Sequence, residues 1–140
     1  MRKILLALTI LTSLLAGARE VQNIDNGWQF LLDGTTGWRS VNVPHDWSIE
    51  GEFDRNSPTG QGGAYLPAGI GWYRRSIRTD IGPDERLFLE FDGMMACSSV
   101  YVDDKLAGYR PNGYVGFTYD ITDLVSKGKE TSSLKVRMPR

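Results

Sequence analysis

The sequence predicts an all-β fold, a β-sandwich or jelly roll built from short antiparallel strands. Apolar and polar residues alternate with a period of two over most of the chain, which is typical of strands with one buried face. Glycine and proline separate these segments, for example at Gly82-Pro83 and Pro111-Asn112-Gly113. Only residues 122–127 carry a helical pattern, a single turn that Gly128 would end.

The alternation defines the expected strands in order along the chain. Its clearest example is the segment that places Leu87, Leu89 and Phe91 on one face and Phe88, Glu90 and Asp92 on the other. The same reasoning predicts strands at residues 28–32, 39–43, 72–79, 87–92, 100–103, 106–109, 117–121 and 134–138.

One expected hairpin has unusual turn residues. Asp103-Asp104 lies between the strand-like residues 100–102 and 106–108. A two-residue type I′ turn needs a positive φ at both central residues, and Asn-Gly satisfies this best. We therefore expect this hairpin either to be strained or to have a longer turn.

The N-terminus has the features of a secretory signal peptide. Arg2 and Lys3 precede a short apolar run at residues 4–15, and Ala16-Gly17-Ala18 follows as a cleavage site. The run is too short for a membrane-spanning helix, and Arg19 stands where a lipoprotein would need cysteine. We predict a signal peptide at residues 1–18 and one exported domain at residues 19–140, which is periplasmic or extracellular.

Composition excludes several functions. The net charge is -1 and the basic residues are scattered, so the sequence indicates neither nucleic-acid binding nor attachment of the mature chain to a membrane surface. We find no metal-ligand spacing and no nucleotide-binding motif, and we predict no cofactor and no metal. The single cysteine, Cys97, follows Ala96 before a strand-like run, so we expect it to be a small buried side chain.

The segment from Pro44 to Arg75 is unusually rich in Trp, Tyr, Gly and Pro. Its central part, residues 51–69, is long for a connection without secondary structure, and loops of that length are usually functional or disordered. The aromatic content favours an ordered loop. Aromatic faces with a few fixed polar groups suit a sugar, which stacks its C–H faces on rings and needs directed hydrogen bonds for its hydroxyls.

A set of motifs in a fixed order extends over nearly all of the expected domain. They are Gly27-Trp28-Gln29-Phe30, Val43-Pro44-His45-Asp46-Trp47, Ile49-Glu50-Gly51, Gly69-Ile70-Gly71-Trp72-Tyr73-Arg74-Arg75, Leu89-Glu90-Phe91-Asp92-Gly93, Val100-Tyr101-Val102, Gly113-Tyr114-Val115-Gly116-Phe117 and Tyr119-Asp120-Ile121-Thr122. Together they resemble the N-terminal sugar-binding domain of glycoside hydrolase family 2, in particular exported β-galactosidase-like enzymes of Bacteroides-type bacteria.

The resemblance implies a galactose-binding-like jelly roll. In the family this domain precedes an immunoglobulin-like domain and a TIM barrel, and the barrel carries the two catalytic glutamates that hydrolyse O-glycosyl bonds with retention. Up to Arg140 there is no room for that barrel, so we predict no catalytic residue in this chain. The family pattern continues with a further strand, and we expect the sandwich to lack it and to expose a strand edge.

The resemblance also indicates the candidate site residues. His45, Asp46 and Trp47 belong to a segment that lies near the barrel interface in the family. His45 either holds a loop by hydrogen bonds while Trp47 packs, or contacts sugar or the neighbouring domain. Asp46 is the better polar candidate for holding a loop or a hydroxyl.

Three further candidates lie on other expected loops. Tyr65 belongs to the loop that in the family can reach the active-site entrance, and it either approaches a ligand or packs within the loop. Asn112 and Tyr114, with Arg110, could line one rim of the sandwich, although a simple turn also explains Pro111-Asn112-Gly113.

The acidic residues have ordinary explanations. A retaining glycosidase needs two carboxylates about 5 Å apart. Glu50 and Glu52 have a suitable sequence spacing, but we interpret them as solvated loop residues. Asp120 and Asp123 flank the expected helical turn, where capping is favoured over metal binding.

Three functions remain open from the sequence. The first is a non-catalytic N-terminal part of a β-galactosidase-like enzyme, whose partners would be the immunoglobulin-like and barrel domains. The second is a free-standing carbohydrate-binding module with weak affinity for β-galactosides or related glycans. The third is a protein-interaction domain that uses its unpaired sheet edge.

Overall fold

The computed structural model describes residues 19–140, so the predicted signal peptide lies outside the described residues. Within this range the chain forms short strands and two 3-10 helices, η1 and η2. In chain order the elements are β1 (Trp28–Leu32), β2 (Arg39–Val41), η1 (Trp47–Glu50), η2 (Gln61–Gly63), β3 (Ile70–Arg78), β4 (Phe88–Phe91), β5 (Ser98–Val102), β6 (Lys105–Arg110), β7 (Phe117–Asp120) and β8 (Thr131–Pro139).

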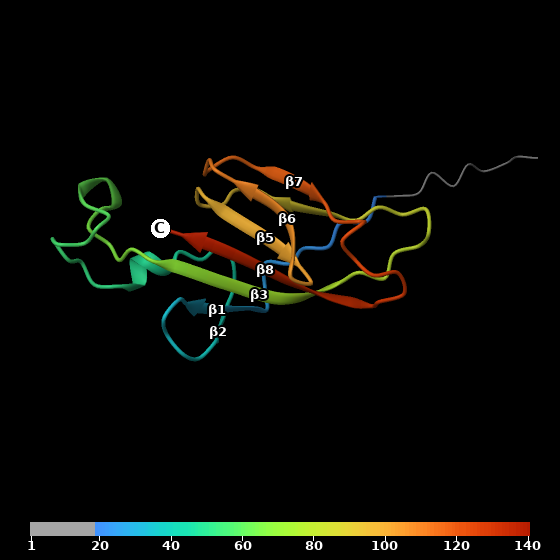
Figure 1. The fold of residues 1–140 in the computed structure, drawn as a ribbon, viewed down its shortest axis with the longest axis horizontal. Coiled ribbons are helices and arrows are strands. Elements are labelled where there is room, and N and C mark those ends of the chain that lie inside the picture. Colours follow the sequence, from blue (N-terminus) through green and yellow to red (C-terminus); the bar gives the residue numbers. More distant parts are fainter. Residues whose placement is uncertain (1–18) are drawn as a thin grey trace, which may run out of the picture.

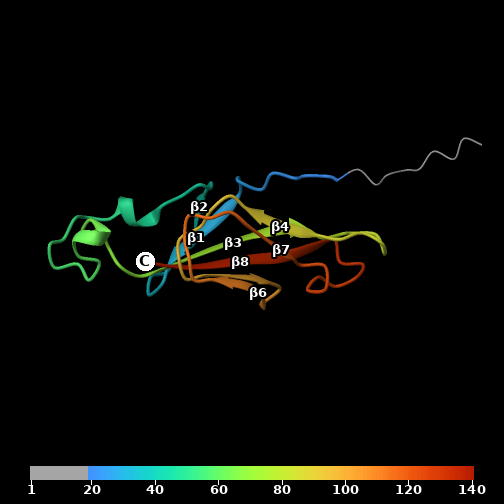
Figure 2. The same ribbon diagram turned by 90° about the horizontal axis from the view of Figure 1, so that it is seen from above.

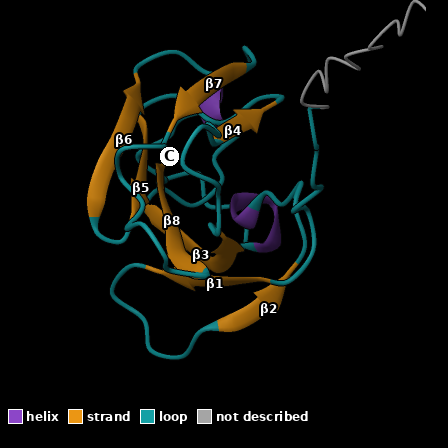
Figure 3. Ribbon diagram, turned by 90° about the vertical axis from the view of Figure 1, so that its right-hand side faces the viewer, coloured by secondary structure: helices purple, strands orange, loops and turns teal. Residues whose placement is uncertain are grey.

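The strands form two antiparallel sheets. The larger has six strands in the order β2-β1-β3-β8-β5-β6, and the smaller pairs β4 with β7. Figure 3 looks along the sandwich and shows the large sheet curving so that β4 and β7 lie beside its β5–β6 side. The all-β, antiparallel prediction is confirmed. That the sandwich lacks the last strand of the family pattern stays a prediction.

β3 and β8 form the centre of the large sheet. Their ladder runs over nine residue pairs, from Ile70 opposite Pro139 to Arg78 opposite Thr131 (Figure 1). Alternate residues on both strands are buried, including Tyr73 and Val136, which lie opposite each other. The period-two pattern thus places the side chains on one face of this ladder in the core.

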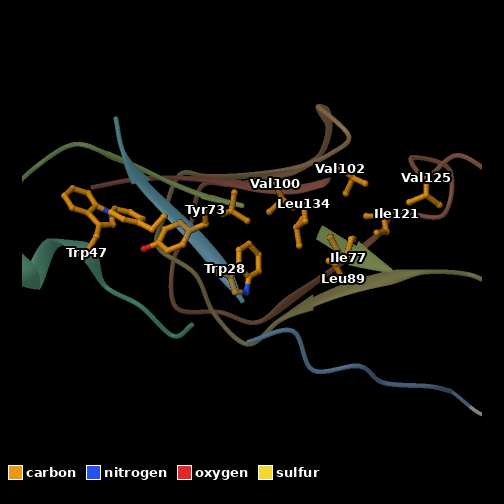
Figure 4. Packing of buried hydrophobic residues seen from close by; sticks show 12 residues of the cluster. Trp28, Trp47, Tyr73, Ile77, Leu89, Val100, Val102, Ile121, Val125 and Leu134 are labelled. Atoms are coloured by element: carbon orange, nitrogen blue, oxygen red, sulfur yellow. The ribbon is translucent and has the colours of Figure 1, made fainter. Parts of the chain in front are cut away.

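Both sheets contribute to a continuous core. Figure 4 shows it extending from Trp47 and Tyr73 at one end to Ile121 and Val125 at the other. The fully buried aliphatic side chains come from strands β5 and β8 and from the residue after β7: Val100, Val102, Leu134 and Ile121. Burying a side chain of this size contributes about 1.5–3 kcal/mol, so this core is the main source of stability.

The Asp103-Asp104 hairpin forms with the two-residue turn and with the predicted strain. The φ angles of Asp103 and Asp104 are 47° and 64°, and β5 pairs with β6 directly on either side. Asp103 offsets its strain because its carboxylate accepts hydrogen bonds from the Ser133 backbone N–H at 2.9 Å and the Lys129 ammonium at 2.8 Å. Led by the Lys129 hydrogen bond, these contacts lower the pKa of Asp103 to about 2.

Two local predictions were wrong. Residues 122–127 form a hydrogen-bonded turn and not a helical turn, with the Leu124 N–H donating to the Ile121 carbonyl at 2.9 Å. A single helical turn is costly to nucleate, and nothing continues it here. Cys97 is exposed and not buried, because it adopts a φ of 60° in the turn that enters β5 and its side chain leaves the core.

No helix within residues 19–140 is long and apolar enough to cross a membrane.

Candidate functional site

The candidate residues gather at one end of the sandwich. The segment 42–69, with η1 and η2, projects at the left of Figures 1 and 2, and the β6–β7 loop at residues 111–116 lies toward the same end. The two segments are separate, and within residues 19–140 no hydrogen bond or ring contact joins Asn112 or Tyr114 to His45. The site therefore has one tightly connected cluster and two outlying loops.

His45 is the centre of the connected cluster. Its Nδ1 lies 2.8 Å from the Tyr73 hydroxyl, and its Nε2 lies 2.9 Å from a Glu50 carboxylate oxygen. A carboxylate only accepts hydrogen bonds, so Nε2 carries the proton. The Tyr73 hydroxyl then donates to Nδ1 of the neutral ring. In the imidazolium form it can instead accept from Nδ1 and donate to the His45 carbonyl, 3.3 Å away.

Glu50 links His45 to β2. Its second carboxylate oxygen accepts a hydrogen bond from the Arg39 guanidinium, which also lies over the Phe30 ring at 4.9 Å. The hydrogen bond from His45, together with the one from Arg39, holds the pKa of Glu50 below its usual range. Glu50 is exposed, as expected, but both of its carboxylate oxygens are engaged, which the sequence did not predict. Glu52 is exposed, as expected.

Asp46 holds the start of η1. One carboxylate oxygen accepts from the Ser48 backbone N–H at 3.1 Å and from the Ser48 hydroxyl at 2.6 Å, which makes Asp46 the N-cap. Arg140 donates to both oxygens, at 2.9 and 2.8 Å. Partial burial opposes ionisation, but the hydrogen bonds from Ser48 and Arg140 hold the pKa of Asp46 below its usual range. This geometry matches the loop-holding alternative.

Trp47 is a packing residue. Its side chain is only 6% exposed and stacks near Phe30, with ring centroids 6.5 Å apart. Gly71 of β3 permits this packing, since a Cβ there would lie 2.7 Å from the indole Nε1. The indole face is covered by protein and is not free to stack on a sugar.

Tyr65 lies farther out on an ordered loop. Its ring meets Phe53 edge-on at 5.3 Å, and Phe53 is 61% exposed. The loop is closed by side chains, because the Ser57 and Thr59 hydroxyls both donate to the Leu66 carbonyl, at 2.6 and 2.7 Å. The predicted order of residues 51–69 thus has a physical basis, and the Phe53–Tyr65 pair is the accessible aromatic feature of this loop.

Asn112 and Tyr114 lie on the β6–β7 loop and are exposed. Tyr114 is 86% exposed and has a φ of 65°, while its backbone N–H donates to the Met94 carbonyl at 3.1 Å. The backbone of this loop is therefore anchored, and its side chains are free to meet a partner.

Sequence reasoning missed several members of the cluster. Arg39 and Arg140 belong to no motif, and the motif that contains Tyr73 gave that residue no role. The three residues meet His45 and Asp46 only because β1 pairs with both β2 and β3 and because β8 lies next to β3. For Tyr73 the available signals were its place in the motif at residues 69–75 and the period-two alternation of β3, which turns its side chain inward. Burial raises the pKa of Tyr73, so its hydroxyl stays protonated as a donor.

The cluster is suited to holding a surface in place and not to acid–base catalysis. Glu50 is paired with Arg39 and His45, and Asp46 is paired with Arg140. Neither carboxylate has the raised pKa of a general acid. Within residues 19–140, His, Cys, Asp and Glu side chains form no group of three or more that could hold a metal ion.

The described residues thus form an antiparallel β-sandwich with one structured end, where ion pairs engage the carboxylates of Glu50 and Asp46. No family model matches the chain. A β-galactosidase of Bacteroides ovatus, BoGH2A, is 38% identical over 91% of this chain, and a β-glucuronidase of Bacteroides fragilis is 32% identical over 79% of it. These matches span only 16% and 15% of the two relatives.

Comparison with solved structures shows the same pattern, a match to most of this chain and to a small part of each similar protein. A β-glycosidase from Bacteroides vulgatus matches with a TM-score of 0.71 and 32% identity over 82% of this chain and 16% of its own. A family 2 glycosyl hydrolase from Bacteroides cellulosilyticus matches with a TM-score of 0.71 and 29% identity, over 84% of this chain and 17% of its own. The chain is therefore homologous to the N-terminal region of family 2 glycoside hydrolases of the β-galactosidase and β-glucuronidase type, as the motifs predicted.

Proposed function

We propose that the chain is the non-catalytic, jelly-roll N-terminal domain of an exported, β-galactosidase-like family 2 glycoside hydrolase. Its parent reaction is the hydrolysis of O-glycosyl bonds with retention in carbohydrate metabolism. Export rests on the signal sequence at residues 1–18. The observation that carries the proposal is the match to BoGH2A, which takes in 91% of this chain but 16% of the relative.

The structured end of the sandwich supports a role in domain packing. The His45–Glu50–Arg39 network and the Asp46–Arg140 ion pair fix segment 42–50 to the sheet. Ile49 within this segment and Phe53 just after it remain 66% and 61% exposed. Apolar side chains held in place on a surface favour contact with a partner. On this proposal the partners are the immunoglobulin-like and barrel domains, and the sugar contact is weak or indirect.

Two other functions have specific support. A free-standing carbohydrate-binding module is favoured by the exposed Phe53 ring beside half-buried Tyr65, because an exposed aromatic ring can stack on a glycan. A protein-interaction domain is favoured by β6, an edge strand of the large sheet on which Leu106 and Tyr109 are 55% and 53% exposed.

Hydrolysis assays and calorimetric titrations of the purified protein distinguish these functions. We expect no hydrolysis of nitrophenyl β-galactoside or β-glucuronide, because the cluster provides no free pair of carboxylates. In calorimetric titration with galactosides we expect a Kd no tighter than about 1 mM, equivalent to about -4 kcal/mol.

Each contrary outcome supports a different alternative. Micromolar glycan binding that Phe53→Ala abolishes, and that Phe88→Ala on β4 leaves intact, would replace the proposal with the binding module. A stable oligomer in light scattering that Leu106→Lys dissolves would favour the interaction domain. Hydrolysis above the uncatalysed rate would contradict the non-catalytic assignment itself.

A further inference from the structure

Three buried polar atoms on the inner surfaces of β5, β6 and β7 lack a hydrogen-bond partner within residues 19–140. They are the Ser98 hydroxyl oxygen, the Arg110 Nε and the Tyr119 hydroxyl oxygen. Buried polar groups in native proteins are nearly always hydrogen-bonded, either to protein or to ordered water. Leaving one unpaired costs about 1–3 kcal/mol, so three unpaired groups in one domain need an explanation.

Two of these groups face each other across a strand pair. Ser98 of β5 lies opposite Arg110 of β6. Directly opposed residues point to the same face of a sheet, with Cβ atoms about 4.5–5.5 Å apart. Ser98 shares this face with Val100, two residues on, and both are 1% exposed. The shared face therefore points into the sandwich.

The third group reaches this face from the small sheet. The ring of Tyr119 on β7 lies against Gly108 of β6, where a Cβ would come within 2.3 Å of ring carbons and 2.8 Å of the hydroxyl oxygen. Gly108 is two residues before Arg110, so both lie on the same face of β6, about 7 Å apart. The Tyr119 hydroxyl thus lies against β6 two residues along the strand from Arg110, on the face that carries Ser98 and Arg110.

Arg110 also connects the two sheets. Its guanidinium carbon lies 4.8 Å from the centre of the Phe117 ring on β7. Burial raises the pKa of the Tyr119 hydroxyl, and the nearby charge of Arg110 opposes this rise. Tyr119 therefore stays protonated. Together, Arg110 provides one guanidinium donor, and Ser98 and Tyr119 provide two hydroxyls that each donate and accept hydrogen bonds.

We propose that this position is a binding site for one ordered water molecule between β6 and β7. The water accepts a hydrogen bond from Arg110 Nε–H and one from either hydroxyl, and it donates to the other hydroxyl. Three hydrogen bonds are typical of a buried structural water. Through this water the site forms a polar contact between the large sheet and the small sheet. Gly108 of β6 has no side chain that could form such a contact.

Whether Ser98→Ala and Tyr119→Phe raise or lower the melting temperature tests the proposal. If the three groups were dry, removing an unpaired hydroxyl would stabilise the protein, so Ser98→Ala and Tyr119→Phe would raise the melting temperature. If they share a water, each change removes a hydrogen bond. We then expect each variant to melt about 3 °C lower. We expect the double variant to lose less than the sum, because both hydroxyls bind the same molecule.

The experiment measures the melting temperatures of the full chain, both single variants and the double variant by calorimetry. Tyr114→Phe is the matched control, since its hydroxyl belongs to a side chain that is 86% exposed, and it should leave the melting temperature unchanged. A single variant that melts at the same or a higher temperature, or fully additive losses, would overturn the proposal. A high-resolution crystal structure should show one water within hydrogen-bond distance of all three atoms, and a dry site there would overturn it independently.

Discussion

Replacing Trp47 with alanine lowers the free energy of unfolding by about 3–5 kcal/mol. Trp47 is 6% exposed, and its indole fills the space between Phe30 and the glycines at the start of β3. Its removal leaves a large cavity and also frees η1, which begins at this residue. Urea unfolding followed by circular dichroism measures the change.

Trp38→Ala is the matched control for that measurement. Trp38 is half-buried and contacts the Arg74 guanidinium at 3.9 Å. Loss of an exposed cation–π contact costs about 0.5–1 kcal/mol. Equal effects of the two substitutions would show that Trp47 does not anchor the site as we describe.

Gly71→Ala has the second large effect, a loss of about 1–3 kcal/mol. An added methyl group would lie 2.7 Å from the Trp47 indole nitrogen and 2.9 Å from the Phe30 ring. Both rings are buried, so neither can move aside without disturbing the core. Because the Phe30 ring also contacts the His45 imidazole edge-on at 5.1 Å, we also expect the NMR signals of the imidazole to shift.

Gly62→Ala provides the comparison for Gly71. A Cβ at Gly62 would meet nothing within 4 Å, and its φ is outside the left-handed region. We expect its unfolding free energy to be unchanged or slightly raised, since alanine restricts the unfolded chain. A tolerated Gly71→Ala would mean that the indole packs elsewhere.

The strands could be predicted from the sequence because their signal is local. Alternation along β8 identified Leu134 and Val136 as inward-facing, and both are buried. The order of the strands had no such signal. The neighbours of β8 are β3 and β5, which lie far from it in the sequence, and such pairing depends on the packing of the whole core.

The site could be predicted only in part for the same reason. His45, Asp46 and Trp47 were identified as candidates by their motif, and their role in a site stays a prediction. The residues that engage them, Arg39 and Arg140, come from distant strand ends and have no distinctive sequence context. The left-handed conformation of Cys97 was also not predictable, because no glycine or asparagine marks its turn.

On the proposed function, this domain performs the role of the N-terminal region in a family 2 glycosidase. Grafting residues 19–140 in place of the matching segment of the Bacteroides ovatus β-galactosidase tests it directly. We predict a folded chimera whose kcat/KM for nitrophenyl β-galactoside stays within about tenfold of the parent, a loss below about 1.4 kcal/mol of transition-state stabilisation. A chimera that folds and elutes as the parent does, yet has no more activity than the enzyme lacking this segment, would contradict the claim.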